Sequence, residues 1–258
     1  MVDPVGYSML NVLASAPLYR RIRWARSSRM RKKRSGALGK QDWISGARKL
    51  LIKSGIANVK VEPLAKALKV TTGSFYWHFA KREDLYDALL QDWYDTNTAP
   101  LHRAVEGAGP DPRQQYLAFF GVWVLERDFN PAYDQAIRDW AKTSGKVARM
   151  LQSIDEDRID LLHKIFQDFG YHGLDATMRA RVTYYHQLGY YALKVREKRE
   201  TRLELAPYYA DILTGNSWLH ELKTANQIRE GMLGNAKFEQ EWNGFDRSFM
   251  RSSAKGSS

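Results

Sequence analysis

The sequence contains no cysteine, which excludes disulfide bonds and thiolate metal sites along all 258 residues. It also has no run of about 18 apolar residues, the length that a membrane-spanning helix needs. Residues 7 to 18 are mildly apolar, but no basic region precedes them as it would in a signal peptide. A chain with these absences fits a reducing compartment. We therefore expect a cytoplasmic protein with no membrane partner.

Groups that carry out catalysis are also missing at recognisable spacings. The sequence has no glycine-rich phosphate loop and no nucleophile elbow, and His163, His172 and His186 do not have the spacing of metal ligands. Several acids between residues 155 and 160 surround Arg158, and we interpret this cluster as a solvated helix face rather than a metal site. The sequence therefore predicts no enzymatic activity, no metal and no cofactor.

Strand patterns are almost absent, whereas apolar residues recur at helical spacing along most of the chain. Proline and glycine bound several of these segments, because proline opens or ends a helix and glycine commonly follows its end. The pattern predicts an all-α protein. The expected helices cover residues 42–54, 61–70, 81–98, 113–129, 131–140, 147–169, 175–196 and 203–213, with a further candidate near 218–232.

The formal net charge of +11 is concentrated near the N-terminus. Residues 1–40 hold ten Lys or Arg against one acid, whereas residues 93–258 are balanced at 22 each. Residues 29–40 lie just ahead of the first helix, where basic side chains can contact a DNA duplex and release its counterions. The other interpretation is a solvated tail, which we favour for residues 1–28.

The chain is organised around residues 70–79, Val-Thr-Thr-Gly-Ser-Phe-Tyr-Trp-His-Phe. A helix that begins at the two threonines places Phe75 and Phe79 one turn apart on an inward face. Helices over 42–54 and 61–70 directly precede it, an arrangement typical of a helix-turn-helix. Exposed aromatic groups on such a short helix are unusual unless a partner docks against them. The outward residues are Tyr76, Trp77 and His78.

This region resembles the TetR family of one-component transcriptional regulators. The resemblance covers about residues 41 to 95 and rests on Gly73 to Phe79, on Arg82 to Leu85 behind it, and on the two helices ahead. It implies an N-terminal three-helix helix-turn-helix bundle followed by a larger helical ligand-binding and dimerisation domain. The chain departs from the family in having Lys69 where a glycine closes the turn, and Lys60 where a capping Ser or Thr is common.

The resemblance also implies that the last helix of the bundle contacts DNA. Hydroxyl groups donate hydrogen bonds to phosphate oxygens, and a Trp ring or a Thr methyl group meets a thymine methyl group. The other interpretation of Tyr76 and Trp77 places them in the bundle core. The predicted DNA-binding residues are Thr71, Thr72, Gly73, Ser74, Tyr76, Trp77, His78, Arg82 and Lys60.

Aromatic residues downstream of the bundle predict an apolar cavity for a small-molecule effector, because pockets in helical bundles are apolar with a few polar groups. Aromatic residues at helical spacing are also common in ordinary cores, so both interpretations stand. The candidates for the effector pocket are Phe119, Trp123, Tyr133, Trp140, Tyr184 and His186.

The helix expected over residues 175–196 is apolar on more than one stripe, which leaves one face for a second subunit. By resemblance, this helix and the one over 203–213 pair with their symmetry mates in a four-helix interface. A glycine in the first helix permits close approach. The candidate interface residues are Tyr185, Gly189, Tyr191 and Ala192.

Four segments follow from these patterns together with what the resemblance implies. Residues 1–40 form a basic arm that we expect to be flexible, 41–92 a helix-turn-helix DNA-binding domain, 93–215 a helical effector-binding and dimerisation domain, and 216–258 a polar, partly disordered extension. The predicted protein is a homodimeric bacterial repressor at the nucleoid, released from its double-stranded operator by an effector. The alternative is a helical binding protein or enzyme whose helix-turn-helix no longer binds specific DNA, and a salt titration with operator and random duplex separates the two.

Overall fold

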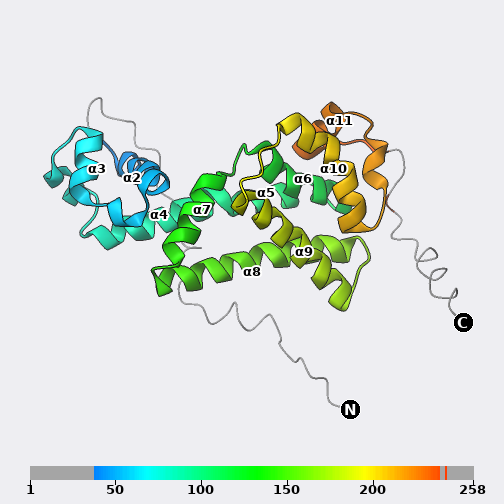
Figure 1. Ribbon diagram of the computed structural model, residues 1–258, viewed down its shortest axis with the longest axis horizontal. Helices are drawn as coiled ribbons and strands as arrows, with labels where there is room; N and C mark the ends of the chain where they lie inside the picture. Colours follow the sequence, from blue (N-terminus) through cyan, green and yellow to red (C-terminus); the bar gives the residue numbers. More distant parts are fainter. Residues whose placement is uncertain (1–37, 239–241, 243–258) are drawn as a thin grey trace, which may run out of the picture.

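The computed structural model describes residues 38–238 and residue 242, and every regular element in this part of the chain is a helix (Figure 1). The prediction of an all-α protein is therefore confirmed here. None of the described helices is long and apolar enough to cross a membrane.

The N-terminal bundle begins with α2 (Lys40–Ser54), a short 3-10 helix η2 (Ile56–Asn58) and α3 (Val61–Leu68), and ends with a second 3-10 helix, η3 (Thr72–Trp77). Its core is aromatic. Trp43 and Phe75 meet edge to face with ring centroids 5.3 Å apart, and Phe79 stacks on Phe75 at 5.1 Å. These contacts fix the angle between α2 and η3, because edge-to-face and offset rings pack in few orientations.

The helix α4 (Arg82–Asn97) joins the bundle to the rest of the protein. The second domain continues with α5 (Ala99–Gly107), α6 (Pro112–Leu125), α7 (Pro131–Ala141), α8 (Gly145–Asp168), α9 (Gly173–Ala192) and α10 (Arg199–Thr214). Figure 1 places the bundle at one end of the molecule and α10 at the other.

Proline and polar caps set several helix starts. Pro100 marks the end of α4 as expected. It also lies in the first turn of α5, a helix that the pattern did not predict. The missing N–H of Pro100 costs no hydrogen bond there, because the first N–H groups of a helix have no partner within it. The Asp111 carboxylate accepts from the backbone N–H of Arg113 at 2.8 Å, so α6 is capped just before Pro112. The Asn130 side chain caps α7 in the same way.

Residues 216–238 belong to the folded core, which differs from the predicted polar extension, and residues 243–258 of that prediction lie outside the described residues. It forms η4 (Trp218–Glu221), α11 (Ala225–Glu230) and a final turn, η5 (Gly231–Asn235). Trp218, Leu219 and Met232 are buried against the second domain. Backbone contact is close, since a Cβ at Gly121 of α6 would lie 2.5 Å from the Met232 carbonyl oxygen. The candidate helix near residues 218–232 is therefore three short helical pieces rather than one continuous helix.

The buried residues form two hydrophobic clusters. One contains the bundle core together with Leu89 and Trp93 of α4 and Tyr133, Ile137 and Trp140 of α7. The other occupies the space between α5, α6, α9, α10 and the C-terminal pieces. The helix-turn-helix bundle is therefore packed directly on α7 rather than joined by a linker.

Candidate functional site

The turn between α3 and η3 has the geometry that the sequence implies. Lys69 adopts the left-handed conformation, with φ 58° and ψ 42°, where a glycine is more usual. The backbone N–H of Val70 donates to the Ala65 carbonyl oxygen at 3.0 Å and closes the end of α3. This turn connects the end of α3 to η3.

The segment predicted to contact DNA is η3, which we call the recognition segment. It is a six-residue 3-10 helix, whereas the sequence predicts an α-helix there. Thr71 occupies the N-cap position, but its side chain accepts no capping hydrogen bond. In a 3-10 helix, side chains at i and i+3 lie above one another. After η3 the hydrogen bonding changes to the α-helical spacing, since the Phe79 N–H donates to the Phe75 carbonyl oxygen at 3.1 Å. Both rings are therefore still buried.

Two aromatic side chains project from this segment into solvent. Trp77 is 87% exposed and Tyr76 is 62% exposed, while Phe75 behind them is fully buried. An indole ring is rarely left in water, because its burial would remove a large apolar area. The core interpretation of Tyr76 and Trp77 is therefore wrong, and the pair forms an exposed aromatic surface.

His78 does not face outward with them. Its Nε2–H donates to the Leu38 carbonyl oxygen at 3.0 Å, and its side chain is half-buried. This contact holds the backbone just ahead of α2 against the end of η3. Lys40 lies beside it, with its ammonium group 5.1 Å from the centre of the Phe79 ring.

The remaining predicted DNA-binding residues are exposed, except for Ser74, which is half-buried. Thr71, Thr72 and Gly73 are exposed, and the Ser74 hydroxyl donates to the Thr71 carbonyl oxygen at 2.9 Å. Arg82 is exposed at the start of α4, with its guanidinium 5.4 Å from the Tyr86 ring centre. Lys60 precedes α3 and is exposed as well.

A buried ionic cluster lies where α4, α7 and α8 meet. Arg158 of α8 is 1% exposed, and its Nη2 donates to Asp134 Oδ1 at 3.0 Å and to the Thr98 hydroxyl at 2.8 Å. Trp93 Nε1 of α4 donates to the same carboxylate oxygen at 3.1 Å. Burial alone raises the pKa of Asp134, but the guanidiniums of Arg158 and Arg138 outweigh it and hold that pKa below its usual value. Asp134 is therefore ionised at neutral pH.

The cluster reaches α9 through Tyr184. Arg138 binds Asp155 with both terminal nitrogens, at 2.9 and 2.7 Å, and the Tyr184 hydroxyl donates to Asp155. The Tyr184 hydroxyl also accepts from Arg158 Nη1 at 3.4 Å. A continuous set of polar contacts thus joins α9 to α4, the helix that connects the bundle to the second domain.

This cluster corrects the interpretation of residues 155–160 as a solvated face. Arg158 stands four residues after Ile154 and four before Leu162, so it falls on the buried stripe of α8. The sequence shows this spacing of Arg158 relative to the apolar residues, but the neighbouring acids led us to interpret the whole segment as solvated. Asp157 is also paired, with its carboxylate 2.8 Å from His102 Nε2.

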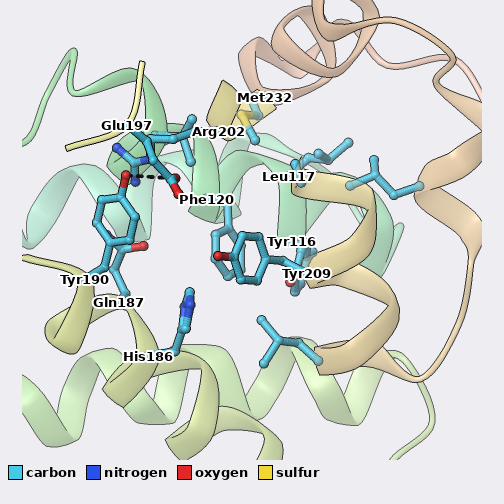
Figure 2. A pocket seen from close by; sticks show the side chains of 14 residues that line it. Tyr116, Leu117, Phe120, His186, Gln187, Tyr190, Glu197, Arg202, Tyr209 and Met232 are labelled. Atoms are coloured by element: carbon cyan, nitrogen blue, oxygen red, sulfur yellow. Dashed lines mark hydrogen bonds between the residues drawn. The ribbon is translucent and has the colours of Figure 1, made fainter. Parts of the chain in front are cut away.

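A largely apolar cavity of about 50 Å³ lies between α6, α9, α10 and the C-terminal segment (Figure 2). Figure 2 shows side chains from all of these elements facing a common space. Residues that line it include Tyr116, Phe120, His186, Gln187, Tyr209 and Met232.

Of the six predicted pocket residues, only His186 lines this cavity. Phe119 and Trp123 are core residues of α6, and Tyr133 and Trp140 pack against α4 and the bundle. Tyr184 belongs to the ionic cluster. Helical spacing shows which residues are buried, but the packing of other helices decides which of them border this cavity.

One face of α9 and α10 is apolar and exposed. Tyr185 is 56% exposed, Ala192 is exposed, and a side chain added at Gly189 would meet open space. Tyr191 instead points inward, where its ring stacks on Phe129 at 5.7 Å and its hydroxyl donates to the Trp123 carbonyl oxygen. The exposed apolar side chains on this face are Leu174, Met178, Val182, Tyr185, Tyr208 and Ile212.

Comparisons with known proteins agree with this geometry. Residues 44–89 match the family model described as bacterial regulatory proteins, tetR family. The chain is 33% identical over 88 residues to the HTH-type transcriptional regulator TtgR of Pseudomonas putida, which covers 32% of this chain and 41% of that protein. The same identity and coverage hold for the probable HTH-type transcriptional regulator ArpR of the same species. The aligned part therefore spans less than half the length of these relatives.

A solved structure extends the likeness to the second domain. The crystal structure of a transcriptional regulator from Rhodococcus sp. Rha1 matches with a TM-score of 0.50 and 16% identity, over 76% of this chain and 92% of that one. At this identity the match shows the fold. The match over residues 44–89 identifies the N-terminal bundle as a helix-turn-helix domain of the tetR family of bacterial regulatory proteins, and the fold match extends over the helical second domain.

Proposed function

We propose that this protein is a DNA-binding transcriptional repressor that reads its operator with η3. The observation that carries the proposal is the exposed pair Tyr76 and Trp77 on a segment whose other face is locked into the core by Phe75 and Phe79. A segment held in place by buried rings, with exposed aromatic and hydroxyl groups on its other face, suits contacts to bases and to the DNA backbone in a major groove.

Contacts to the DNA backbone come from the rim of this surface. Lys60 precedes η3 in sequence and Arg82 follows it, and both are exposed. They supply positive charge for phosphates, which position a protein without reading sequence. Thr71 and Thr72 add hydroxyl donors. Base reading is then assigned to Tyr76 and Trp77, since an aromatic ring or methyl group can meet a thymine methyl group.

The basic residues ahead of the bundle add nonspecific affinity in this proposal. Because His78 holds the Leu38 carbonyl beside η3, the chain enters the bundle next to the proposed DNA surface. Residues 29–34 carry five Lys or Arg and lie outside the described residues. Nine residues span at most about 30 Å, enough to follow a duplex from that point.

Two copies of the chain are needed for tight operator binding, because half-sites on one face of DNA lie about one helical turn or a multiple apart. The exposed apolar face of α9 and α10 supports a homodimer. Tyr185 and Gly189 share this face of α9, while Tyr208 and Ile212 lie one turn apart on α10. A second copy would cover apolar groups that a monomer leaves in water.

The cavity beside α9 is our proposed effector site, and the ionic cluster is the proposed route to the bundle. Tyr184 is close in sequence to the cavity residues His186 and Gln187, and it bonds to the cluster that includes Trp93 of α4. At its other end, α4 donates from the Tyr86 hydroxyl to the Val59 carbonyl oxygen at 2.9 Å. A shift of α9 therefore changes contacts that position α4, and with it the spacing of two recognition segments.

Substitution of the exposed pair tests the proposal. An operator is first isolated by selecting genomic fragments that the purified protein binds. Tyr76→Ala and Trp77→Ala should each abolish preference for that operator over random duplex, with unchanged circular dichroism and oligomeric state. The control is Gln152→Ala on α8, which removes an exposed side chain outside the proposed DNA and dimer surfaces and should bind operator normally. Trp77→Ala protein that keeps operator preference, or that unfolds, would refute the assignment.

The arm is tested separately with alanine at Arg31, Lys32, Lys33 and Arg34 together. The slope of log K against log salt should fall by about 0.9 for each phosphate that the variant no longer neutralises, on operator and random duplex alike. An unchanged slope would remove the arm from the interface. A variant without operator preference would instead mean that these residues read bases.

A further inference from the structure

The cavity contains a buried amide group without a partner. Gln187 of α9 is 4% exposed and lines the cavity, and its Nε2 is buried with no hydrogen-bond partner in the described part of the protein. An unpaired buried amide is costly, and most buried polar atoms are paired for that reason. The amide donor therefore marks the place where an acceptor atom of a bound molecule belongs.

The charged groups around the cavity already have partners. The Arg202 guanidinium lies 3.6 Å from a Glu126 carboxylate oxygen and 4.5 Å from the centre of the Tyr190 ring. Glu197 accepts from the Tyr190 hydroxyl at 3.2 Å, the bond drawn in Figure 2. Among the described lining residues, Arg202 and Glu197 carry opposite charges, so the lining has no net charge to offset that of an ionic ligand.

His186 adds no positive charge at neutral pH. Its imidazole packs on the Tyr209 ring at 4.9 Å, and partial burial together with the nearby Arg202 guanidinium lowers its pKa. The imidazole is therefore neutral at neutral pH. The rest of the lining is made mainly of aromatic and aliphatic side chains from α6 and α10.

The size of the cavity limits the ligand. Sites for drug-sized molecules are about 300–1,000 Å³, whereas this cavity measures about 50 Å³. A ligand of a few non-hydrogen atoms fits with small side-chain adjustments. Met232 forms part of the wall, and a methionine adapts readily because its side chain is unbranched and flexible.

We propose that this cavity binds small, uncharged, mainly apolar molecules that carry one hydrogen-bond acceptor, such as a ketone or ether oxygen, which Gln187 Nε2 recognises. The inference rests on the proposed function in taking the cavity as the effector site, but it states a ligand chemistry that can be measured without DNA.

A matched set of five-membered-ring probes tests the chemistry. Cyclopentanone carries the acceptor, cyclopentane lacks it, and cyclopentanecarboxylate and cyclopentylammonium carry opposite charges. Binding to the full-length protein is measured by ligand-observed NMR titration. Cyclopentanone should bind most tightly of the four. Tighter binding of either ion, or equal binding of cyclopentane, would overturn the proposal.

Two variants connect the binding to this cavity. Gln187→Met keeps the length of the side chain but removes the amide, so cyclopentanone affinity should fall on the order of 10-fold, the effect of removing one hydrogen bond, while cyclopentane affinity stays the same. Ala206→Phe fills the space from α10 and should abolish binding of both, with circular dichroism confirming the fold. Cyclopentanone that binds Gln187→Met as tightly as the natural protein would refute the role of the amide.

Operator release is measured afterwards with the same probes. If cyclopentanone binds with the expected dependence on Gln187 but leaves operator affinity unchanged, the ligand chemistry stands and the effector role fails. If the protein binds its operator but none of the probes, the ligand chemistry fails while the DNA-binding proposal stands.

Discussion

Removal of the Arg158 guanidinium should destabilise the protein more than removal of any exposed arginine. In Arg158→Met the apolar part of the side chain is kept, while Asp134 loses a partner at 3.0 Å and the Thr98 hydroxyl loses one at 2.8 Å. Both charged side chains are at most 4% exposed. Breaking a buried pair on one side costs about 3–5 kcal/mol. Because Arg138 still holds Asp134 at 3.0 Å, we expect the lower end, about 3 kcal/mol.

This free energy translates into a measurable melting shift. For chains of about 150–250 residues, each kcal/mol lowers the Tm by roughly 2–4 °C, so Arg158→Met should melt about 6–12 °C lower at pH 7. Urea unfolding gives the free energy directly. The matched control is Arg149→Met on the same helix, which is exposed and should change stability by less than about 0.5 kcal/mol.

Three outcomes would refute this account of the cluster. One is an Arg158→Met protein within about 1 kcal/mol of the natural one, since that is the range of an exposed ion pair. A second is an equal loss in Arg149→Met. The third is a double variant, Arg158→Met with Arg138→Met, that is as stable as Arg158→Met alone, because Asp134 would then have lost both of its guanidinium partners.

The remaining predictions concern the turn, one histidine pair and the dimer face. Lys69→Gly should stabilise the protein by up to about 1 kcal/mol in urea unfolding, because Lys69 has φ 58°; a loss of stability would contradict the strain. The hydrogen bond to Asp157 raises the pKa of His102 despite partial burial, so its stabilising effect is present below the unfolded pKa and is lost as pH rises through the folded pKa. The stability difference between the natural protein and His102→Gln should thus be larger at pH 5.5 than at pH 8.5, and a difference independent of pH would exclude this linkage. Ile212→Glu, at a position 76% exposed, should give monomers by light scattering and lose operator binding, whereas a dimeric variant would place the interface elsewhere.

The sequence by itself determined the elements and the position of the DNA-binding bundle. Apolar residues at helical spacing predicted nearly every helix of the described chain, because a helix must bury one stripe whatever it packs against. The inward Phe75 and Phe79 and the outward Tyr76 and Trp77 followed from local spacing too. These features depend on residues within about one helical turn of each other, and the order of those residues can be read directly from the sequence.

The tertiary structure alone decided the sites that several helices build together. The cavity borders on Gln187 rather than on the aromatic residues that the pattern favoured, because the space left between α6, α9 and α10 depends on how their side chains interlock. The partners of Arg158 come from residues 24 to 61 positions away in sequence. Periodicity reports whether a residue is buried, but the energy of a buried charge depends on which groups lie within about 3 Å of it, and only the packed chain brings those groups together.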